Sequence, residues 1–246
     1  MTFNCLTIFP EMFTSFTGTS LCAKAIEKGL ITIHLYDIRD YTKDKHKRVD
    51  DYPFGGGAGM LMTPQPLFDC FDAVQKNTKG KKVRTIYLSP GGTVLTQGKA
   101  NHLQEQYEVL NLLCGHYEGV DQRVLDTYID EELSIGDYVL TGGELPAMVL
   151  MDCVMRYVPE VLSNEDSTKS ESFGDGLLEY PQYTRPQEYN GLTVPEVLVS
   201  GHHKNIENWQ REQSIVKTAR VRPDLLDNAQ LTEDEKMLIC DVKSEK

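Results

Sequence analysis

Three apolar segments, each followed by a loop of small residues, constrain the fold of this chain more than any other feature. They are Val83–Leu88, Glu108–Cys114 and the segment that begins at Glu132. Their apolar residues run continuously where a half-exposed strand would alternate, and helical stretches separate them. Such runs are typical of strands that are buried on both faces, so the sequence predicts an α/β fold with a parallel sheet.

The remaining chain predicts two domains. Further strands are expected at Phe3–Phe9 and Leu30–Tyr36, and helices at 66–74, 98–107, 120–128 and 144–156. Residues 163–174 are polar and almost free of large apolar side chains, which is typical of a flexible linker. We therefore expect one domain at residues 1–162 and a small, mostly helical domain at residues 175–246, with helices near 206–218 and 232–242.

Composition places the chain among soluble globular proteins, with 40% apolar and 25% charged residues. No apolar run approaches the ~20 residues of a membrane span, and the N-terminal segment lacks the pattern of a signal peptide. We expect a cytoplasmic protein with no membrane partner. The six cysteines are widely spaced without a C-x-x-C pair, so we expect core thiols, no disulfide framework and no metal site.

Two common phosphate-binding motifs are excluded. Gly98-Lys99 resembles the end of a Walker A loop, but Thr93 and Ala100 stand where glycine and a hydroxyl residue are needed. The glycines at 55–59 do not form G-x-G-x-x-G because residue 60 is Met. The sequence therefore supports neither ATP hydrolysis nor an ordinary Rossmann cofactor site.

The three loops that follow the buried strands are candidates for a binding site. They are SPGG at 89–92, CGHYEG at 114–119 and IGDYVLTGG at 135–143. In parallel sheets, ligands bind beyond the carboxyl ends of the strands. Glycine lets the backbone approach closely, so N–H and C=O groups could contact an adenine and a ribose. The alternative is three tight turns without a ligand, but three similar loops at one predicted edge favour a site.

Long motifs follow one another along the chain. They are DDYPFGGGAGM at 50–60, YLSP at 87–90, CGHYEG at 114–119, SIGDYVLTGGELPA at 134–147, GLL at 176–178, YTRP at 183–186 and PEVLVSG at 195–201. In this order they resemble the TrmD family, the bacterial tRNA (guanine-N1)-methyltransferases of the SPOUT class. The resemblance covers nearly the whole chain.

The resemblance implies a fold and an activity that the residue pattern does not show. The first domain is expected to contain a deep trefoil knot, which is rare among folds. S-adenosylmethionine would donate a methyl group to N1 of the guanosine at position 37 of tRNA, just 3′ of the anticodon. A homodimer with active sites built from both chains is implied, as is dependence on Mg²⁺.

The resemblance also implies the site residues. Asp51 and Gly59 would contact the substrate. The residues implied in cofactor binding are Tyr87, Leu88, Ser89, Pro90, Gly115, Tyr117, Glu118, Ile135, Gly136, Asp137, Tyr138, Val139, Leu140, Gly142, Gly143 and Pro146. His116 and Gly91 stand where the family often has arginine and glutamine, which puts a side-chain contribution at those two positions in doubt.

Methyl transfer to N1 needs a base for the N1 proton and a cation near O6, where negative charge develops. Arg156 matches a functional arginine of the family, although an ion pair with Asp152 on the same helix is the structural alternative. The family's base is an aspartate in an Asp-Ser-Phe triplet. Here the matching triplet begins with Glu171, and Asp166 in Glu-Asp-Ser is the rival candidate.

A net charge of −12 argues against a protein that coats nucleic acid, so tRNA binding would have to be local. Basic residues cluster before the glycine loop and in the second domain, at Lys43, Lys45, His46, Lys47, Arg48, Lys204, Arg211, Lys217, Arg220 and Arg222. A solvated charged face is the alternative. Two other functions stay open, namely a knotted methyltransferase for another RNA site and a non-catalytic RNA-binding module that retains the pocket.

Overall fold

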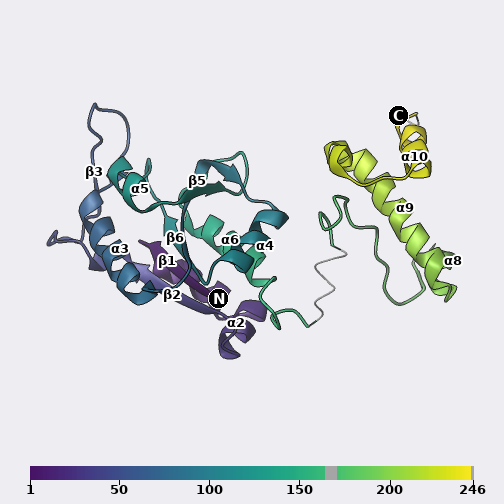
Figure 1. Cartoon of the computed structure of the whole chain (residues 1–246), viewed down its shortest axis with the longest axis horizontal. Coiled ribbons are helices and arrows are strands. Elements are labelled where there is room, and N and C mark those ends of the chain that lie inside the picture. Colours follow the sequence, from purple (N-terminus) through teal and green to yellow (C-terminus); the bar gives the residue numbers. More distant parts are fainter. Residues whose placement is uncertain (164–170, 245–246) are drawn as a thin grey trace. The chain divides into compact units, whose positions relative to one another are not determined.

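The computed structural model describes residues 1–163 and 171–244 of the chain (Figure 1). The chain divides into two compact units, Met1–Ser163 and Asn164–Lys246. The first unit is built on a five-stranded sheet in the order β2-β1-β6-β5-β7, in which all neighbouring strands are parallel. The predicted α/β class with a parallel sheet is thereby confirmed.

The strands of this sheet are β1 (Thr2–Thr7), β2 (Thr32–Asp37), β5 (Val83–Val94), β6 (Val109–Cys114) and β7 (Glu131–Ser134). Every residue of β6 is buried, which agrees with its central place and its continuous apolar sequence. In the middle of the sheet Asn111 accepts a hydrogen bond from Asn4 (2.8 Å) and donates one to Thr85 (3.2 Å). The buried polar side chains of three adjacent strands are therefore paired with one another.

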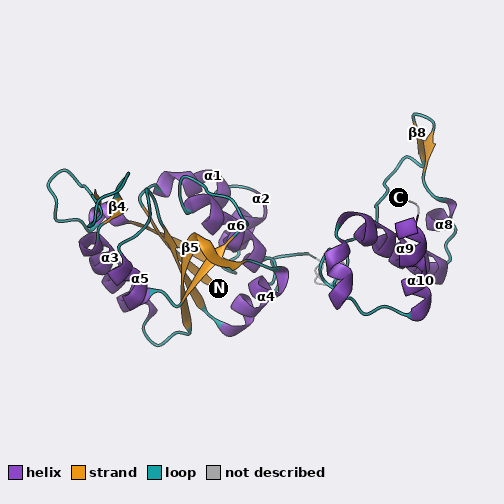
Figure 2. Ribbon diagram, turned by 90° about the horizontal axis from the view of Figure 1, so that it is seen from above, coloured by secondary structure: helices purple, strands orange, loops and turns teal. Residues whose placement is uncertain are grey.

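Helices cover both faces of the sheet (Figure 2). One face carries α3 (Pro64–Thr78) and α5 (Gln122–Tyr128), and the other carries α1 (Thr14–Thr17), α2 (Ser20–Glu27), α4 (Gln97–Gln106) and α6 (Glu144–Met155). Short 3-10 helices lie at η1 (Pro10–Phe13) and η2 (Ile38–Asp40). Each face has its own apolar core, with Phe71 and Val124 in one and Leu103 and Leu150 in the other.

The sequence predicted that the strand beginning at Val83 ends at the loop 89–92, and this prediction was wrong. The strand continues to Val94, because Leu133 of β7 pairs with both Leu88 and Thr93 while the residues between them bulge out. Gly92 makes the bulge possible, since a Cβ there would lie 2.5 Å from the carbonyl carbon of Glu132. The small residues thus interrupt the pairing without ending the strand.

The glycine loop at 55–59 is the tip of a short hairpin. Strands β3 (Asp50–Asp51) and β4 (Leu61–Met62) pair in antiparallel fashion on either side of it. The loop was predicted from its glycines, but these strands were not, because two residues are too few for an alternating pattern.

The described part of the second unit is mostly helical, as predicted. It contains α8 (Glu196–Val199), α9 (His203–Val221), the 3-10 helix η3 (Pro223–Asn228) and α10 (Glu233–Ser244). Its core includes Leu177, Ile215 and Ile239. The hairpin of β8 (Glu188–Tyr189) and β9 (Leu192–Thr193) was not predicted, and its Asn190-Gly191 turn has positive φ at both residues. That dipeptide is a strong hairpin signal.

Candidate active site

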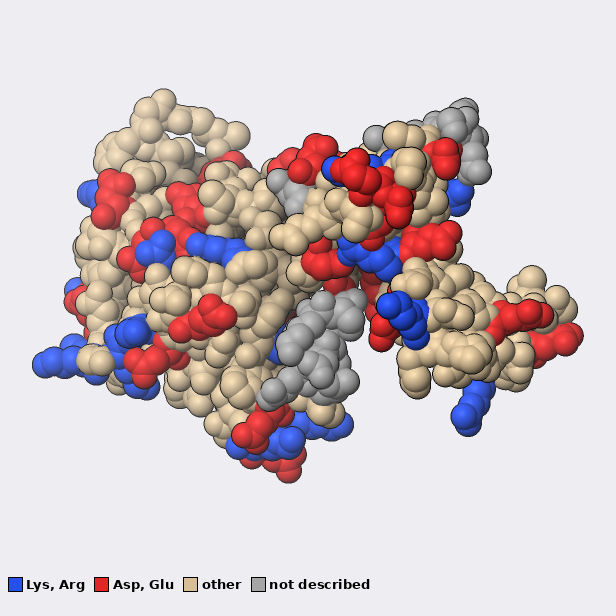
Figure 3. Space-filling model, turned by 45° about the vertical axis from the view of Figure 1, so that its right-hand side comes forward, with Lys and Arg blue, Asp and Glu red and all other residues tan. Residues whose placement is uncertain are grey.

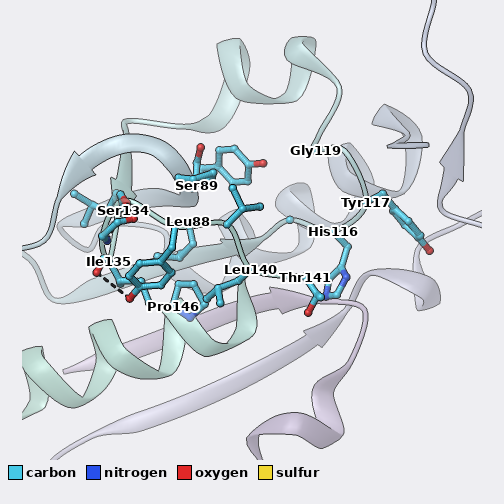
Figure 4. Close-up of a pocket in the computed structure, with 18 of the residues that line it drawn as sticks. Leu88, Ser89, His116, Tyr117, Gly119, Ser134, Ile135, Leu140, Thr141 and Pro146 are labelled. Atoms are coloured by element: carbon cyan, nitrogen blue, oxygen red, sulfur yellow. Dashed lines mark hydrogen bonds between the residues drawn. The ribbon is translucent and has the colours of Figure 1, made fainter. Parts of the chain in front are cut away.

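A pocket of about 180 Å³ lies at the bulge of β5 and the carboxyl ends of β6 and β7 (Figure 4). Leu88, Ile135, Leu140 and Pro146 group at one end of it, and His116 and Tyr117 lie at the other. The lining residues are Tyr87, Leu88, Ser89, Pro90, Gly115, His116, Tyr117, Glu118, Gly119, Leu133, Ser134, Ile135, Gly136, Tyr138, Val139, Leu140, Thr141, Gly142 and Pro146. Three segments that are separated in the sequence, one of them the bulge of β5, therefore form one cavity.

All the residues expected to bind the cofactor line this pocket except Asp137 and Gly143. Asp137 and Gly143 belong to the loop 135–143, whose other predicted residues line the pocket. The Gly143 N–H donates to the Gly115 carbonyl (2.9 Å). Five lining residues were not predicted from the sequence, namely His116, Gly119, Leu133, Ser134 and Thr141. All five fall in the loops or strand ends already singled out, so inclusion of whole loops would have found them.

Two glycines allow the loops to pack this closely. A Cβ on Gly115 would lie 2.8 Å from Cε2 of Tyr87, and a Cβ on Gly143 would lie 2.7 Å from the Cα of Cys114. The second contact is with backbone that cannot rotate away. Only glycine therefore fits at residue 143 without a shift of the strand end.

A buried carboxylate fixes the loop that follows β6. Glu144, the first residue of α6, is 1% exposed. It accepts a hydrogen bond from the Thr7 hydroxyl (2.6 Å), and its other oxygen lies 2.7 Å from Nε2 of His116. A buried carboxylate needs such partners, so Glu144 links the end of β1, the start of α6 and the pocket loop. His116 thus has a side-chain role that the sequence left in doubt.

Two thiols beside this network are buried core groups. Burial, followed by the charge of Glu144, raises the pKa of Cys5 far above its usual range. Burial also raises the pKa of Cys114 well above its ordinary value. Both thiols stay protonated at neutral pH, and a protonated thiol is a poor nucleophile. The expected structural role of these cysteines agrees with their burial.

The glycine loop is tied to the pocket. The Glu118 N–H donates to the Met60 carbonyl and the Met62 N–H donates to the Gly119 carbonyl, each at 2.9 Å. Gly59 lies so close to Glu118 that a Cβ would come within 2.3 Å of its side chain. Asp51 is exposed on β3, at the other side of the same hairpin. The two residues expected to contact the substrate therefore share one hairpin at the edge of the pocket.

The two candidate catalytic residues belong to different units. Arg156 is the C-cap of α6 and is partly exposed. Glu171 belongs to the second unit, where it lines a cavity of about 260 Å³ together with Asp175 and Arg211. The rival base Asp166 lies outside the described residues.

The basic clusters hold fewer unpaired charges than the sequence suggests. Before the glycine loop, Lys43 pairs with Asp69, Lys47 with Asp40 and Arg48 with Asp44. In the second unit, Arg211 pairs with Asp175 and Glu235, and Arg222 pairs with Asp224. Figure 3 accordingly shows blue and red side chains next to one another over the face in view.

Two classes of site receive no support from the described residues. Within residues 1–163 and 171–244, no group of three or more His, Cys, Asp or Glu side chains is placed to hold a metal ion. In the same part of the chain, no helix combines the length and the apolar character needed to cross a membrane.

A parallel sheet with a pocket at its carboxyl edge gives the first unit the arrangement in which α/β domains bind their ligands. The chain belongs to the tRNA (guanine-1)-methyltransferase TrmD family, whose model matches residues 1–228. The resemblance drawn from the motifs is confirmed.

Several relatives are similar over their full length. The tRNA (guanine-N(1)-)-methyltransferase of Alkaliphilus metalliredigens is 56% identical over 242 residues, which is 98% of each chain. That of Ruminiclostridium cellulolyticum is 57% identical over 225 residues, covering 92% of this chain and 96% of the relative. That of Halalkalibacterium halodurans is 50% identical over 245 residues, covering 100% and 99%.

Proposed function

We propose that this chain is an enzyme that transfers a methyl group from S-adenosylmethionine to N1 of the guanosine at position 37 of tRNA. The observation that carries the proposal is the pocket formed by three loops at one sheet edge, in a chain that matches the TrmD family over residues 1–228. The full-length similarity to proteins named tRNA (guanine-N(1)-)-methyltransferase supports the substrate.

The pocket residues suit this methyl donor. Leu88, Leu140 and Pro146 offer apolar surface for a flat purine, while the backbone groups of the glycine-rich loops offer donors and acceptors for its polar edges. When bound, the donor supplies an electrophilic methyl group on a sulfonium. The chain's contribution is to hold that group in line with guanine N1 and to exclude water.

Arg156 and Glu171 are proposed as the catalytic pair. The Glu171 carboxylate would accept the N1 proton as the methyl carbon bonds to N1. The Arg156 guanidinium would donate hydrogen bonds to O6, where negative charge develops during the transfer. Glutamate at residue 171 keeps the charge of the family's aspartate and extends its reach by one methylene.

A homodimer with composite active sites is part of the proposal. Next to the pocket, the loop before α6 exposes Val139 (82%), and α6 exposes Leu145 (51%) and Val149 (42%). Leu145 and Val149 are four residues apart and share one face of the helix. An exposed apolar patch beside a site is typical of an interface. Sedimentation of the wild type and of Leu145→Lys tests this, and a dimeric, fully active variant would contradict it.

The second unit is proposed to bind tRNA, and the hairpin that carries Asp51 and Gly59 is proposed to contact the target guanine. Lys204 and Lys217 on α9 are candidates for phosphate contacts. A knotted path through the pocket loops, assistance by Mg²⁺ and a location in the cytoplasm belong to the same proposal.

A methyl-transfer assay with labelled S-adenosylmethionine tests the proposal. The substrates are two tRNA transcripts that differ only in guanosine or adenosine at position 37. We expect label in the first transcript alone. Equal labelling of both would indicate another RNA site. Binding of both transcripts without any label would indicate a non-catalytic RNA-binding module.

A further inference from the structure

The segment 171–179, which carries Glu171, is folded onto the second unit. The Phe173 N–H donates to the Leu177 carbonyl (2.8 Å), and the Gly174 N–H donates to the Glu171 carbonyl (3.1 Å). Leu177 is only 1% exposed and packs in the core of the unit. The Leu178 N–H donates to the Thr218 hydroxyl on α9 (2.9 Å). The backbone that carries the proposed base is therefore anchored by its C-terminal half.

Arg211 of α9 is the side chain that closes this arrangement. Each nitrogen of its guanidinium donates to a different acceptor. Nη1 donates to the Asp175 carboxylate (2.6 Å), Nε donates to the Glu235 carboxylate (2.8 Å) and Nη2 donates to the Gln230 carbonyl (2.8 Å). Asp175 accepts from Arg211 with one oxygen and from the Leu177 N–H with the other (3.2 Å). The guanidinium thus holds the turn that follows Glu171 against α9.

Glu235, one of the three acceptors of Arg211, is itself held in place. Glu235 accepts from the Thr232 N–H (2.8 Å), and the Thr232 hydroxyl accepts from the Glu235 N–H (3.3 Å), which is a capping box at the start of α10. Arg211 therefore connects the Glu171 segment to two helices through groups that have little freedom to move.

We propose that Arg211 is a positioning residue for methyl transfer, which acts by making the Glu171 segment part of the tRNA-binding unit. This inference rests on the proposed role of Glu171 as base. A carboxylate carried on this unit reaches guanine N1 when tRNA docks on the same unit. Arginine suits the task because its planar fork serves several acceptors in fixed directions, which a lysine ammonium cannot reproduce.

A double-mutant cycle tests the proposal on the full-length protein. Single-turnover rates at saturating tRNA and donor are measured for the wild type, Arg211→Met, Glu171→Gln and the double variant. If Arg211 acts through Glu171, Arg211→Met slows the wild type by about tenfold, within the ~100-fold that a 1 Å misplacement can cost. It then adds little in the Glu171→Gln background, because coupled residues are non-additive.

Two other results separate the possible failures. A slow Glu171→Gln variant together with an equal effect of Arg211→Met in both backgrounds would overturn the Arg211 proposal alone. An unchanged rate in Glu171→Gln would remove the base, and the positioning role with it. A folded Arg211→Met variant with the wild-type rate would also overturn the proposal.

Matched variants guard against a merely structural effect. Lys236→Met removes the exposed ion pair with Glu233 on α10 and is expected to keep the wild-type rate. If Arg211→Met does not fold, Asp175→Asn takes its place in the cycle, since it removes one arm of the same contact. Arg211→Lys is expected to recover only part of the rate.

Hydrogen exchange gives a readout that does not depend on activity. The Phe173 and Gly174 amides are hydrogen-bonded within the segment. We expect Arg211→Met to speed their exchange while the amides of α9 near Ile215 stay protected. Unchanged exchange at Phe173 and Gly174 would show that Arg211 does not hold the segment, and the proposal would fail.

Discussion

The pocket of the first unit and the Glu171 segment of the second unit are held in place in different ways. The pocket is made of the β5 bulge and the loops that follow the adjacent strands β6 and β7, and close backbone contacts such as that of Gly143 fix them. The Glu171 segment is anchored by one buried leucine and by ion pairs of Arg211. The proposed donor site is therefore built into the sheet, whereas the position of the proposed base depends on side chains from three segments.

The largest effect is expected at the proposed base. Glu171→Gln keeps the shape of the side chain but removes its ability to take a proton. We expect the single-turnover rate to fall at least tenfold, since general bases contribute typically ~10²–10⁴-fold. Donor affinity should not change, because the pocket belongs to the other unit. Rapid-quench kinetics and donor titration measure the two quantities.

Glu179→Gln is the matched control for this variant. Glu179 lines the same cavity and belongs to the same segment, but it has no proposed chemical role. Equal losses in the two variants would show that the segment needs negative charge in general and would argue against Glu171 as the base.

Donor affinity should be more sensitive to a methyl group added at Gly143 than to the loss of the Glu171 charge. Gly143→Ala places a Cβ 2.7 Å from the Cα of Cys114, so the strand end must shift. We expect donor affinity to fall by about tenfold or more and unfolding to become easier by about 1–3 kcal/mol, as in other overpacked cores. Calorimetric titration of the donor and urea unfolding give the two values.

Gly91→Ala provides the comparison within the same rim of loops. A Cβ on Gly91 would meet only the Ser89 hydroxyl at 3.6 Å, an ordinary contact. Wild-type affinity in Gly91→Ala with a loss in Gly143→Ala would show that close backbone packing holds the pocket. Similar losses in both would show that any added bulk in these loops is harmful.

The pocket could be predicted from the sequence because each strand and the loop that follows it are recognisable from neighbouring residues. A buried strand such as Val109–Cys114 is predicted by its continuous apolar run, and the loop that follows it in the sequence must lie at the edge of the sheet. The family motifs then assigned fourteen of the nineteen lining residues. The continuation of β5 past Pro90 was not predictable in this way, because it depends on how Leu133 pairs on a neighbouring strand.

Contacts between distant residues could not be predicted. Glu144 meets Thr7 across 137 positions, and Arg211 meets Asp175 across 36. In the sequence both arginine and glutamate look like surface charges, and Arg211 was counted among residues that could bind phosphate. The Asn190-Gly191 turn is different, since its hairpin signal was present in the sequence and was overlooked.

A smaller effect is expected at the carboxylate that braces the pocket. Glu144→Leu removes both acceptor oxygens in a 1% exposed position, which leaves the Thr7 hydroxyl and Nε2 of His116 without this partner. We expect a loss of about 1–3 kcal/mol in the free energy of unfolding, the usual range for a buried group left without its partner. Urea unfolding measures it. Glu105→Leu, at an exposed glutamate of α4, should be nearly neutral, and a neutral Glu144→Leu would show that the brace is unimportant.

The smallest effect is expected in the pH dependence of the stability of the second unit. The hydrogen bond from Arg211 holds the pKa of Glu235 below its ordinary value of 4.5, although burial opposes the shift. A carboxyl whose pKa is lower in the folded state contributes stability above pH 4.5, and that stability is lost as the pH falls through the folded pKa. We expect this contribution to be about 0.5–1 kcal/mol, as for other partly exposed pairs.

Trp209 on α9 is the only tryptophan of the chain, so its fluorescence reports unfolding of the second unit alone. In the wild type, the urea midpoint followed at Trp209 should fall as the pH is lowered from 6 to 4. Arg211→Met should weaken that dependence, because Glu235 then has a more nearly ordinary pKa in the folded unit. An equally steep dependence in the variant would mean that other carboxyl groups control the acid stability of this unit. The Arg211–Glu235 pair would then contribute little to stability, and the second unit would owe its stability to the core around Leu177 and Ile215.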